Sequence, residues 1–167
     1  MSRVVQFYRL ENVHPLKYTI DEMWQWDDRQ LERMHNYIQW WFPLDEPSGN
    51  CLGAPILTKD EIKQFHSDKE IQRRLLKSFS VMMNYYGFAF DDQTGKIGKA
   101  NDFEKHSGWL FPDNHNYLRI TRILKSMTLL GFPELSKELL CMLEGLYKEY
   151  RAYIGPKTWK YWADSVR

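Results

Sequence analysis

Apolar positions recur at helical spacing through most of the chain, most clearly over residues 115–132. Apolar residues of that stretch recur at spacings of three and four: Leu118, Ile120, Ile123, Leu124, Met127 and Leu130. Such spacing places them along one face of an α-helix. His115, Arg119 and Arg122 fall at i, i+4 and i+7 and therefore share another face. The pattern predicts a central helix with an apolar seam and a cationic stripe.

The other helices are predicted from their start and stop signals. Capping-box patterns, in which a Ser or Thr is followed three residues later by Glu, occur three times: Thr19 with Glu22, Thr58 with Glu61, and Ser67 with Glu70. Asp27 or Asp28 begins a helix that runs to about Phe42, where Pro43 stops it. Asp113 or Asn114 caps the central helix, and Gly131 ends it.

The ends of the chain and its middle complete the expected fold. Residues 3–10 are predicted to form a short extended arm, and alternating apolar residues around Thr94 and Gly95 predict a small β-hairpin near 88–99. Pro133 begins a helix that runs to about Tyr153, and a last amphipathic segment begins at Gly155. The prediction is an all-α fold, one globular domain over residues 1–167 with about six or seven helices and the hairpin.

Composition narrows the function classes. Hydrophobic residues make up 43% of the chain and aromatic residues 16%, which is enough for a folded core and excludes a disordered chain. The net charge of +1 gives no general field for nucleic acid or a membrane surface. No signal peptide is recognisable, and no apolar run approaches the ~18 residues that span a bilayer. Cys51 and Cys141 are expected to be free thiols, and the protein is expected to be soluble and cytoplasmic.

Motifs for metal, cofactor or nucleophile chemistry are missing from the sequence. The histidines, at positions 14, 35, 66, 106 and 115, include no H-x-x-x-H pair that would place two imidazoles on one helical face. Residues 94–99 have neither the spacing nor the context of a phosphate-binding loop, and no G-x-S-x-G occurs. We therefore predict no metal, no cofactor and no defined catalytic residue.

The cationic stripe is the first candidate site. Two arginines one turn apart can bind a carboxylate or phosphate through paired hydrogen bonds, and His115 would lie at the positive end of the helix dipole. Lys125 lies beside them. The alternative is a solvated face, or arginines that pair with carboxylates of the same chain.

The second candidate site is the stretch HNYIQWWFP at residues 35–43. His35 and Gln39 lie at i and i+4 on one helical face, among aromatic side chains that include Trp40. Buried polar groups must find hydrogen-bond partners. The stretch is therefore either a structural polar network or part of a ligand pocket.

Together, HNYIQWWFPL at 35–44 and HNYLRITRILKSMTLLGF at 115–132 resemble the paired signatures of the opioid growth factor receptor family's N-terminal domain. Shorter agreements extend the resemblance from about residue 6 to 166: Gln6-Phe7-Tyr8, Ala54-Pro55, Tyr85-Tyr86-Gly87 and Tyr161-Trp162. The chain is more similar to the compact, stand-alone versions of the domain. The resemblance implies a non-enzymatic domain that binds an enkephalin-type opioid peptide. It leaves membrane-associated and nuclear locations as alternatives to the cytoplasm.

The resemblance favours the hypothesis that the two stretches pack side by side and form one pocket or polar network. Its predicted ligand-binding residues are His35, Gln39, Trp40, His115, Asn116, Arg119 and Arg122. The expected partner is an anionic small molecule or a peptide, with no nucleic acid. The alternatives are an enzyme that acts on a phosphorylated or nucleotide substrate, with His35 or His115 as the acid–base group, and a purely structural polar core.

Overall fold

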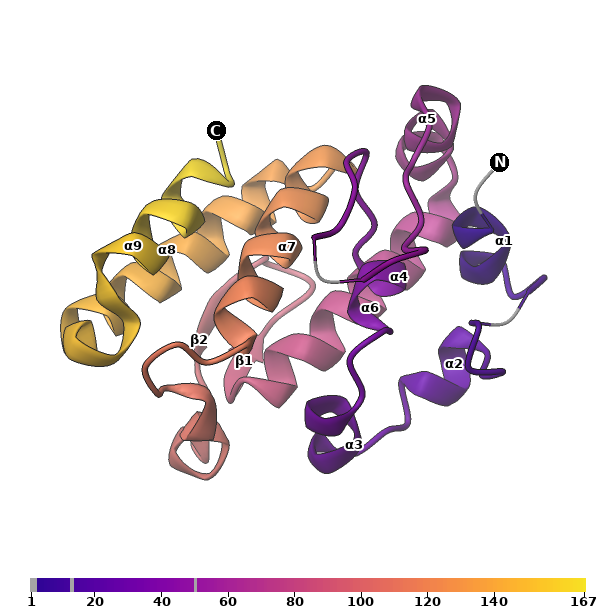
Figure 1. The fold of residues 1–167 in the computed structure, drawn as a ribbon. Helices are drawn as coiled ribbons and strands as arrows, with labels where there is room; N and C mark the ends of the chain where they lie inside the picture. Colours follow the sequence, from indigo (N-terminus) through magenta and orange to yellow (C-terminus); the bar gives the residue numbers. More distant parts are fainter. Residues whose placement is uncertain (1–2, 13, 50) are drawn as a thin grey trace. The chain divides into compact units, whose positions relative to one another are not determined.

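The computed structural model describes residues 3–12, 14–49 and 51–167, which are mostly helical (Figure 1). These described residues also form a two-stranded antiparallel sheet at the position of the expected hairpin. The prediction of a helical fold with one small hairpin is therefore confirmed. The chain divides into two compact units, Met1–Val81 and Met82–Arg167, and each is described by itself. The single domain over residues 1–167 stays a prediction.

The described residues of the first unit form four short helices, followed by two longer ones. Its elements are α1 (Val4–Tyr8), α2 (Ile20–Met23), α3 (Asp28–Arg33), α4 (Ile38–Trp41), α5 (Lys59–Ser67) and the main part of α6 (Lys69–Tyr85). The predicted extended arm over residues 3–10 is wrong, because Val4, Val5, Phe7 and Tyr8 are buried on one short helix. Their spacing of i, i+1, i+3 and i+4 suits a helix that buries one face, and packing decides between that and a strand.

The single helix predicted from Asp27 or Asp28 to Phe42 is also wrong. The chain leaves α3 at Met34, whose backbone is extended, and α4 begins only at Ile38. Two hydrogen bonds from side chains hold this break. The Tyr37 hydroxyl donates to the carbonyl oxygen of Leu31 at 2.9 Å, and His14 Nε2 lies 2.9 Å from the carbonyl oxygen of Asn36. These bonds occupy carbonyl groups that a continuous helix would use for its own ladder.

The helix starts follow the predicted caps with one exception. The Thr19 side chain accepts from the Glu22 N–H, and Thr58 and Glu61 form a full capping box, as expected. The box predicted for Ser67 is wrong, because Ser67 is the last residue of α5. Asp68 takes its place, since Asp68 Oδ1 accepts from the N–H groups of Glu70 and Ile71 at 3.0 and 3.2 Å.

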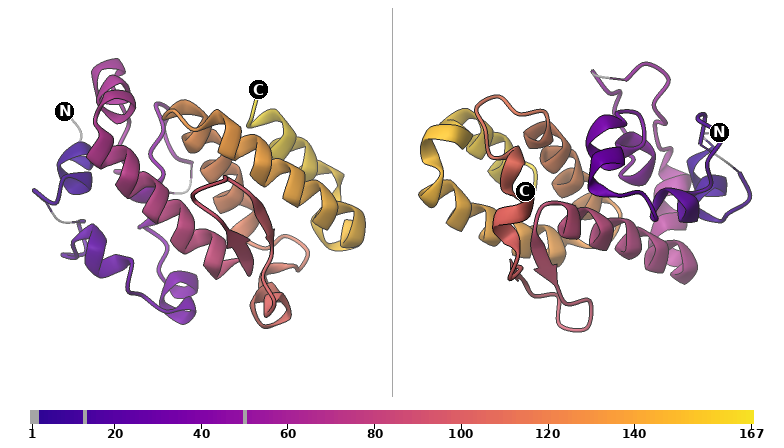
Figure 2. Two further views of the ribbon diagram at one scale, coloured as in Figure 1. Left: turned by 180° about the vertical axis from the view of Figure 1, so that it is seen from behind. Right: turned by 90° about the horizontal axis from the view of Figure 1, so that it is seen from below.

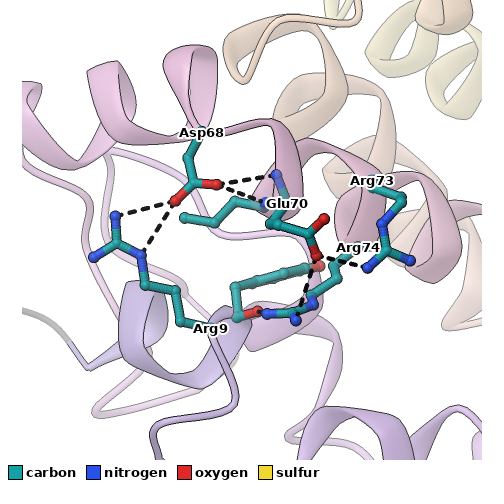
Figure 3. Close-up of polar contacts among 7 residues, drawn as sticks. Arg9, Asp68, Glu70, Arg73 and Arg74 are labelled. Carbon is teal, nitrogen blue, oxygen red and sulfur yellow. Dashed lines mark hydrogen bonds and ion pairs between the residues drawn. The ribbon is translucent and has the colours of Figure 1, made fainter.

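Asp68 also connects α6 to α1, as Figure 3 shows. Arg9, which follows α1, donates to Asp68 Oδ2 from Nε and Nη2 at 3.3 and 3.1 Å. Arg74 on α6 donates to the carbonyl oxygen of Tyr8 at 2.8 Å. Beneath these contacts, the buried Tyr8 hydroxyl bonds to the carbonyl oxygen of Trp41 and lies 2.9 Å from Ser78 Oγ. The contacts of the Arg9 and Arg74 guanidinium groups and those of the buried Tyr8 hydroxyl therefore both hold the short α1 in place.

The second unit contains the hairpin and three long helices. Its elements are β1 (Phe88–Phe90), β2 (Ile97–Lys99), the 3-10 helix η1 (Phe103–Trp109), α7 (Asn116–Leu129), α8 (Pro133–Glu149) and α9 (Arg151–Asp164). Helices α7, α8 and α9 pack against one another (Figure 1), and the hairpin lies along α8 (Figure 2). Lys99 Nζ pairs with Glu149 at 2.8 Å, which fixes β2 to the end of that helix.

The boundaries of these helices agree in part with the sequence. The N-cap of α7 is His115 and not the predicted Asp113 or Asn114, although the Asn114 side chain accepts from the Asn116 N–H at 2.9 Å. Gly131 follows α7 with φ of 106°, and Pro133 begins α8, as predicted. The prediction that this helix runs to about Tyr153 is wrong, because Tyr150 leaves helical geometry and α8 ends at Glu149. The last helix begins at Arg151 and is kinked at Gly155, where φ is 80° and ψ is 156°.

Candidate functional site

We use the name first signature stretch for residues 35–43, which contain α4. His35 is exposed at its start, whereas Gln39 and Trp40 are each only 6% exposed. The Trp40 ring meets the rings of Phe7 and His14 edge to face, with centroids 5.5 and 5.4 Å away. The predicted site residue Trp40 is therefore part of the core of the first unit.

Gln39 and Trp41 carry the most unusual polar atoms of this stretch. Both Gln39 Oε1 and Trp41 Nε1 are buried, and within the described residues neither has a hydrogen-bond partner. Leaving a buried acceptor or donor unpaired costs on the order of 1–3 kcal/mol. Nearly all buried polar groups in folded proteins avoid that cost. Gln39 Oε1 and Trp41 Nε1 therefore each need a partner that the described residues do not supply.

His14 supports the first signature stretch from outside it and was not among the predicted site residues. Its side chain is 1% exposed, Nδ1 accepts from the Leu16 N–H at 3.0 Å, and Nε2 faces the carbonyl oxygen of Asn36. An acceptor at Nδ1 and a carbonyl at Nε2 require the neutral ring with its proton on Nε2. Burial lowers the pKa of His14, and the hydrogen bond to Asn36 opposes that change only in part. No local motif in the sequence indicates this role.

We use the name second signature stretch for residues 115–126, which begin and largely form α7. Asn116 is fully buried and Arg119 is 6% exposed, whereas Leu118 is 54% exposed. The predicted apolar seam is therefore wrong at Leu118, and the alternative of a solvated cationic face is wrong at Arg119. The reason is geometric, because Asn116, Arg119 and Ile123 lie at i, i+3 and i+7 and share the buried side of α7. His115 is exposed and Arg122 is half-buried.

The Asn116 amide is the centre of a polar cluster in the second unit. Its Oδ1 accepts from the Tyr86 hydroxyl at 3.2 Å and from Arg119 Nη1 at 3.3 Å. Its Nδ2 donates to the Tyr85 hydroxyl at 3.5 Å. The cluster therefore joins α7 to the tyrosine pair at the end of α6. Tyr85 and Tyr86 are not among the predicted site residues. The sequence signal that could have indicated them is the motif Tyr85-Tyr86-Gly87, which served only as part of the family resemblance.

Aromatic side chains hold this polar cluster in position. Trp109 Nε1 donates to the carbonyl oxygen of Tyr86 at 3.2 Å, and Trp162 Nε1 donates to that of Tyr117 at 3.1 Å. Burial and, to a smaller degree, the nearby Asp113 carboxylate raise the pKa of Tyr117 to about 12. Tyr117 is therefore uncharged at neutral pH, which suits its packing between Trp109 and Trp162.

The predicted site residues thus fall into two groups. The structure brings Asn116 and Arg119 into direct contact, with His115 and Arg122 on the same helix, and it places His35, Gln39 and Trp40 in the first unit. A pocket shared by both groups stays a prediction. In the ranges that the structure describes, no three His, Cys, Asp or Glu side chains gather as they would around a metal ion. Across the same ranges, every helix falls short of the length and apolarity that a bilayer crossing requires.

The fold and the two signature stretches define a mostly helical protein in which the polar residues Gln39, Asn116 and Arg119 are buried. The chain belongs to the family of the opioid growth factor receptor conserved region, whose model matches residues 2–167. This confirms the resemblance that the two signature stretches indicate. No solved structure matches the chain significantly.

Similar proteins come from several vertebrates. The chain is 42% identical over 123 residues to the human opioid growth factor receptor, an alignment that covers 72% of this chain and 18% of the human protein. It is 36% identical over 146 residues to mouse opioid growth factor receptor-like protein 1, which covers 86% of this chain and 31% of that protein. The chain therefore spans less than a third of the length of these curated relatives.

Proposed function

We propose that this chain is a non-enzymatic ligand-binding domain that takes a peptide ligand, as the name of its receptor relatives suggests. The proposed binding residues are those predicted from the sequence: His35, Gln39, Trp40, His115, Asn116, Arg119 and Arg122. Membership of the receptor family supports this proposal. No structural observation favours the alternative of an enzyme that uses His35 or His115 as its acid–base group.

The observation that carries the proposal is the buried Gln39 Oε1, which has no hydrogen-bond partner among the described residues. A ligand N–H group would supply the missing donor and recover the free energy lost by burying the oxygen. Peptides provide such donors in their backbone amides and in their terminal ammonium group. Gln39 is therefore assigned to an N–H group of the ligand.

A peptide also carries a terminal carboxylate, which suits the guanidinium groups of Arg119 and Arg122 in the second unit. Arginine binds carboxylates through charge-assisted hydrogen bonds that are about twice as strong as neutral ones. Arg119 already contacts Asn116 Oδ1, so the Asn116 amide orients the guanidinium group that would receive the carboxylate. In this proposal Asn116 positions Arg119, and the two tyrosines position Asn116.

The test is isothermal titration calorimetry with an enkephalin peptide that has a free terminal carboxylate, and with the same peptide as its C-terminal amide. We expect saturable binding of the free acid and weaker binding of the amide. Gln39→Leu should lose about tenfold or more in affinity, because a hydrogen bond to a charged group contributes roughly 1.5–3 kcal/mol. The exposed Gln25 provides the matched control, since Gln25→Leu makes the same change outside the proposed site.

Stability measurements separate binding from folding in this experiment. Replacing an unpaired buried amide with an apolar side chain of similar size should leave the free energy of unfolding unchanged or raise it. Gln39→Leu should therefore fold normally while binding poorly. Equal peptide affinity of Gln39→Leu and the wild type would remove Gln39 from the site. No saturable binding of the free acid would overturn the peptide assignment.

A further inference from the structure

A strip of aromatic side chains lies on the surface of the second unit, at the junction of α8 and α9. We use the name aromatic strip for Phe111, Tyr147, Tyr150, Tyr153 and Trp159. Phe111 is 60% exposed and Tyr153 is 46% exposed, and the other three are half-buried. Soluble proteins normally leave large apolar side chains exposed singly, so contacting aromatic side chains on one surface mark a candidate interaction surface.

The rings of the aromatic strip make contact within two groups, one of Phe111, Tyr153 and Tyr150 and the other of Tyr147 and Trp159. The Tyr153 ring lies 6.4 Å from Phe111 and 6.4 Å from Tyr150, measured between centroids. Tyr147 and Trp159 stack in parallel, with centroids 5.3 Å apart and an interplanar angle of 5°. The kink at Gly155 lets α9 turn so that Trp159 returns to the Tyr147 ring, because its φ of 80° suits glycine.

The charged groups beside the aromatic strip leave Arg151 and Lys157 without a counter-ion. Three other cations nearby are paired: Lys148 with Glu144, Lys160 with Asp164, and Lys99 with Glu149. In the described part of the chain, neither Arg151 nor Lys157 makes an ion pair, and the Arg151 guanidinium lies 5.1 Å from the centre of the Tyr147 ring. The carboxylates of Glu104 and Glu149 also lie near Tyr150, together with Lys99.

We propose that the aromatic strip is a docking surface for a peptide segment of a partner protein that carries apolar or aromatic side chains and an acidic residue. Tyr, Trp and Arg are the residue types that contribute most to the affinity of protein–protein interfaces. The acidic residue would face Arg151 and Lys157, and the apolar side chains would cover Phe111 and Tyr153. This surface shares no residue with the proposed ligand site.

Charge decides between a peptide and a single-stranded nucleic acid, which also stacks on aromatic rings. Nucleic-acid binding depends on neutralising many phosphates, and its affinity falls with salt in proportion to that number. With Arg151 and Lys157 as the unpaired cations, the strip neutralises about two phosphates, which gives a salt slope of only about −1.4. A short acidic peptide matches this small charge better.

The test uses the full chain and a random peptide display library as the probe. Peptides that combine Asp or Glu with Trp, Phe or Leu should be enriched, and the best of them is then measured by fluorescence anisotropy. Arg151→Glu and Tyr153→Ala should each weaken its binding by about tenfold or more, as losses at the centre of an interface do. Lys137→Glu, at an exposed position near the start of α8, is the matched charge control and should bind as the wild type does.

The remaining outcomes would overturn the proposal. The first is that the library enriches no acidic aromatic peptide. The second is that the enriched peptides bind Arg151→Glu as tightly as they bind the wild type. The third is that a single-stranded oligonucleotide binds more tightly than any peptide. Circular dichroism shows whether each variant is folded. Gln39→Leu should leave this binding unchanged, so that failure here and failure of the proposed ligand site are distinguishable.

Discussion

The Tyr86 hydroxyl donates to Asn116 Oδ1 at 3.2 Å, and this bond connects two family motifs that are far apart in the sequence. Both residues are fully buried, and Arg119 shares the same amide oxygen. Because Tyr86 and Arg119 donate to its oxygen and its nitrogen donates to Tyr85, the Asn116 amide is held in one orientation. The guanidinium group of Arg119 is therefore positioned by residues outside α7 as well as by its own helix.

Tyr86→Phe removes that bond without changing the shape of the ring. We expect the free energy of unfolding to fall by about 1 kcal/mol, because a buried neutral hydrogen bond contributes roughly 0.5–1.5 kcal/mol. Chemical denaturation measures the change. Tyr161→Phe is the control, since Tyr161 is 49% exposed and should lose almost nothing. Equal stability of Tyr86→Phe and the wild type would show that the bond contributes nothing to folding.

Gly87, which follows the tyrosine pair, is expected to tolerate no side chain. Its φ is +85°, and an added Cβ would lie 3.0 Å from His106 Cβ and 3.0 Å from Phe103 Cδ2. Gly87→Ala should lower the free energy of unfolding by more than about 1 kcal/mol, because backbone strain and overpacking combine. Gly145→Ala should have the opposite effect. An added Cβ at Gly145 would meet open space within α8, so the free energy of unfolding should rise by about 0.5–1 kcal/mol.

The start of α6 offers a direct test of the corrected cap. Asp68→Ala should lower the free energy of unfolding by about 1 kcal/mol or more, since it removes the acceptor for two backbone N–H groups and the partner of Arg9. Ser67→Ala should change it by less than about 0.5 kcal/mol, as an ordinary surface substitution does. Thermal unfolding of both variants decides the matter. A larger loss from Ser67→Ala than from Asp68→Ala would restore the capping box predicted from the sequence.

Signals from neighbouring residues in the sequence correctly predicted several caps, turns and helix ends. The Thr58–Glu61 box, the hairpin near 88–99, the end of α7 at Gly131 and the start of α8 at Pro133 all depend on a few neighbouring residues. The family resemblance was likewise carried by two continuous strings of residues. These features were predicted correctly because no distant contact was needed to create them.

Contacts between distant residues account for the errors. Helical spacing over 27–42 predicts one helix, but bonds from His14 and Tyr37 hold a break between α3 and α4. Periodicity on α7 predicts a cationic stripe opposite an apolar seam, but it cannot indicate that Arg119 is buried and contacts Asn116 Oδ1. The unpaired Gln39 Oε1 likewise depends on what surrounds α4 and has no signature in the sequence.

The buried His14 predicts that the protein loses stability in acid. Its pKa is lowered from the ordinary 6.5 in the folded state, mainly by burial, so the unfolded chain binds the proton first as the pH falls. Stability therefore rises with pH wherever the unfolded state holds more protons. The contribution of His14 is complete above about pH 6.5 and is lost progressively below it, down to its lowered pKa.

Geometry explains why the protonated ring does not fit its site. A proton on Nδ1 would point at the Leu16 N–H, which Nδ1 accepts in the neutral ring, while Nε2 already donates to Asn36. His14→Asn can keep an acceptor for Leu16 but cannot titrate, so its free energy of unfolding should fall less steeply than that of the wild type below pH 6.5. His66→Asn, at an exposed position on α5, should keep the wild-type response. Denaturation series across this pH range test the point, and identical slopes for His14→Asn and the wild type would contradict it. Hydrogen exchange at Leu16 provides a local measurement. In the wild type, the Leu16 amide should exchange faster in acid than its intrinsic pH dependence predicts, because protonation of His14 removes its acceptor. In His14→Asn this extra acceleration should be absent.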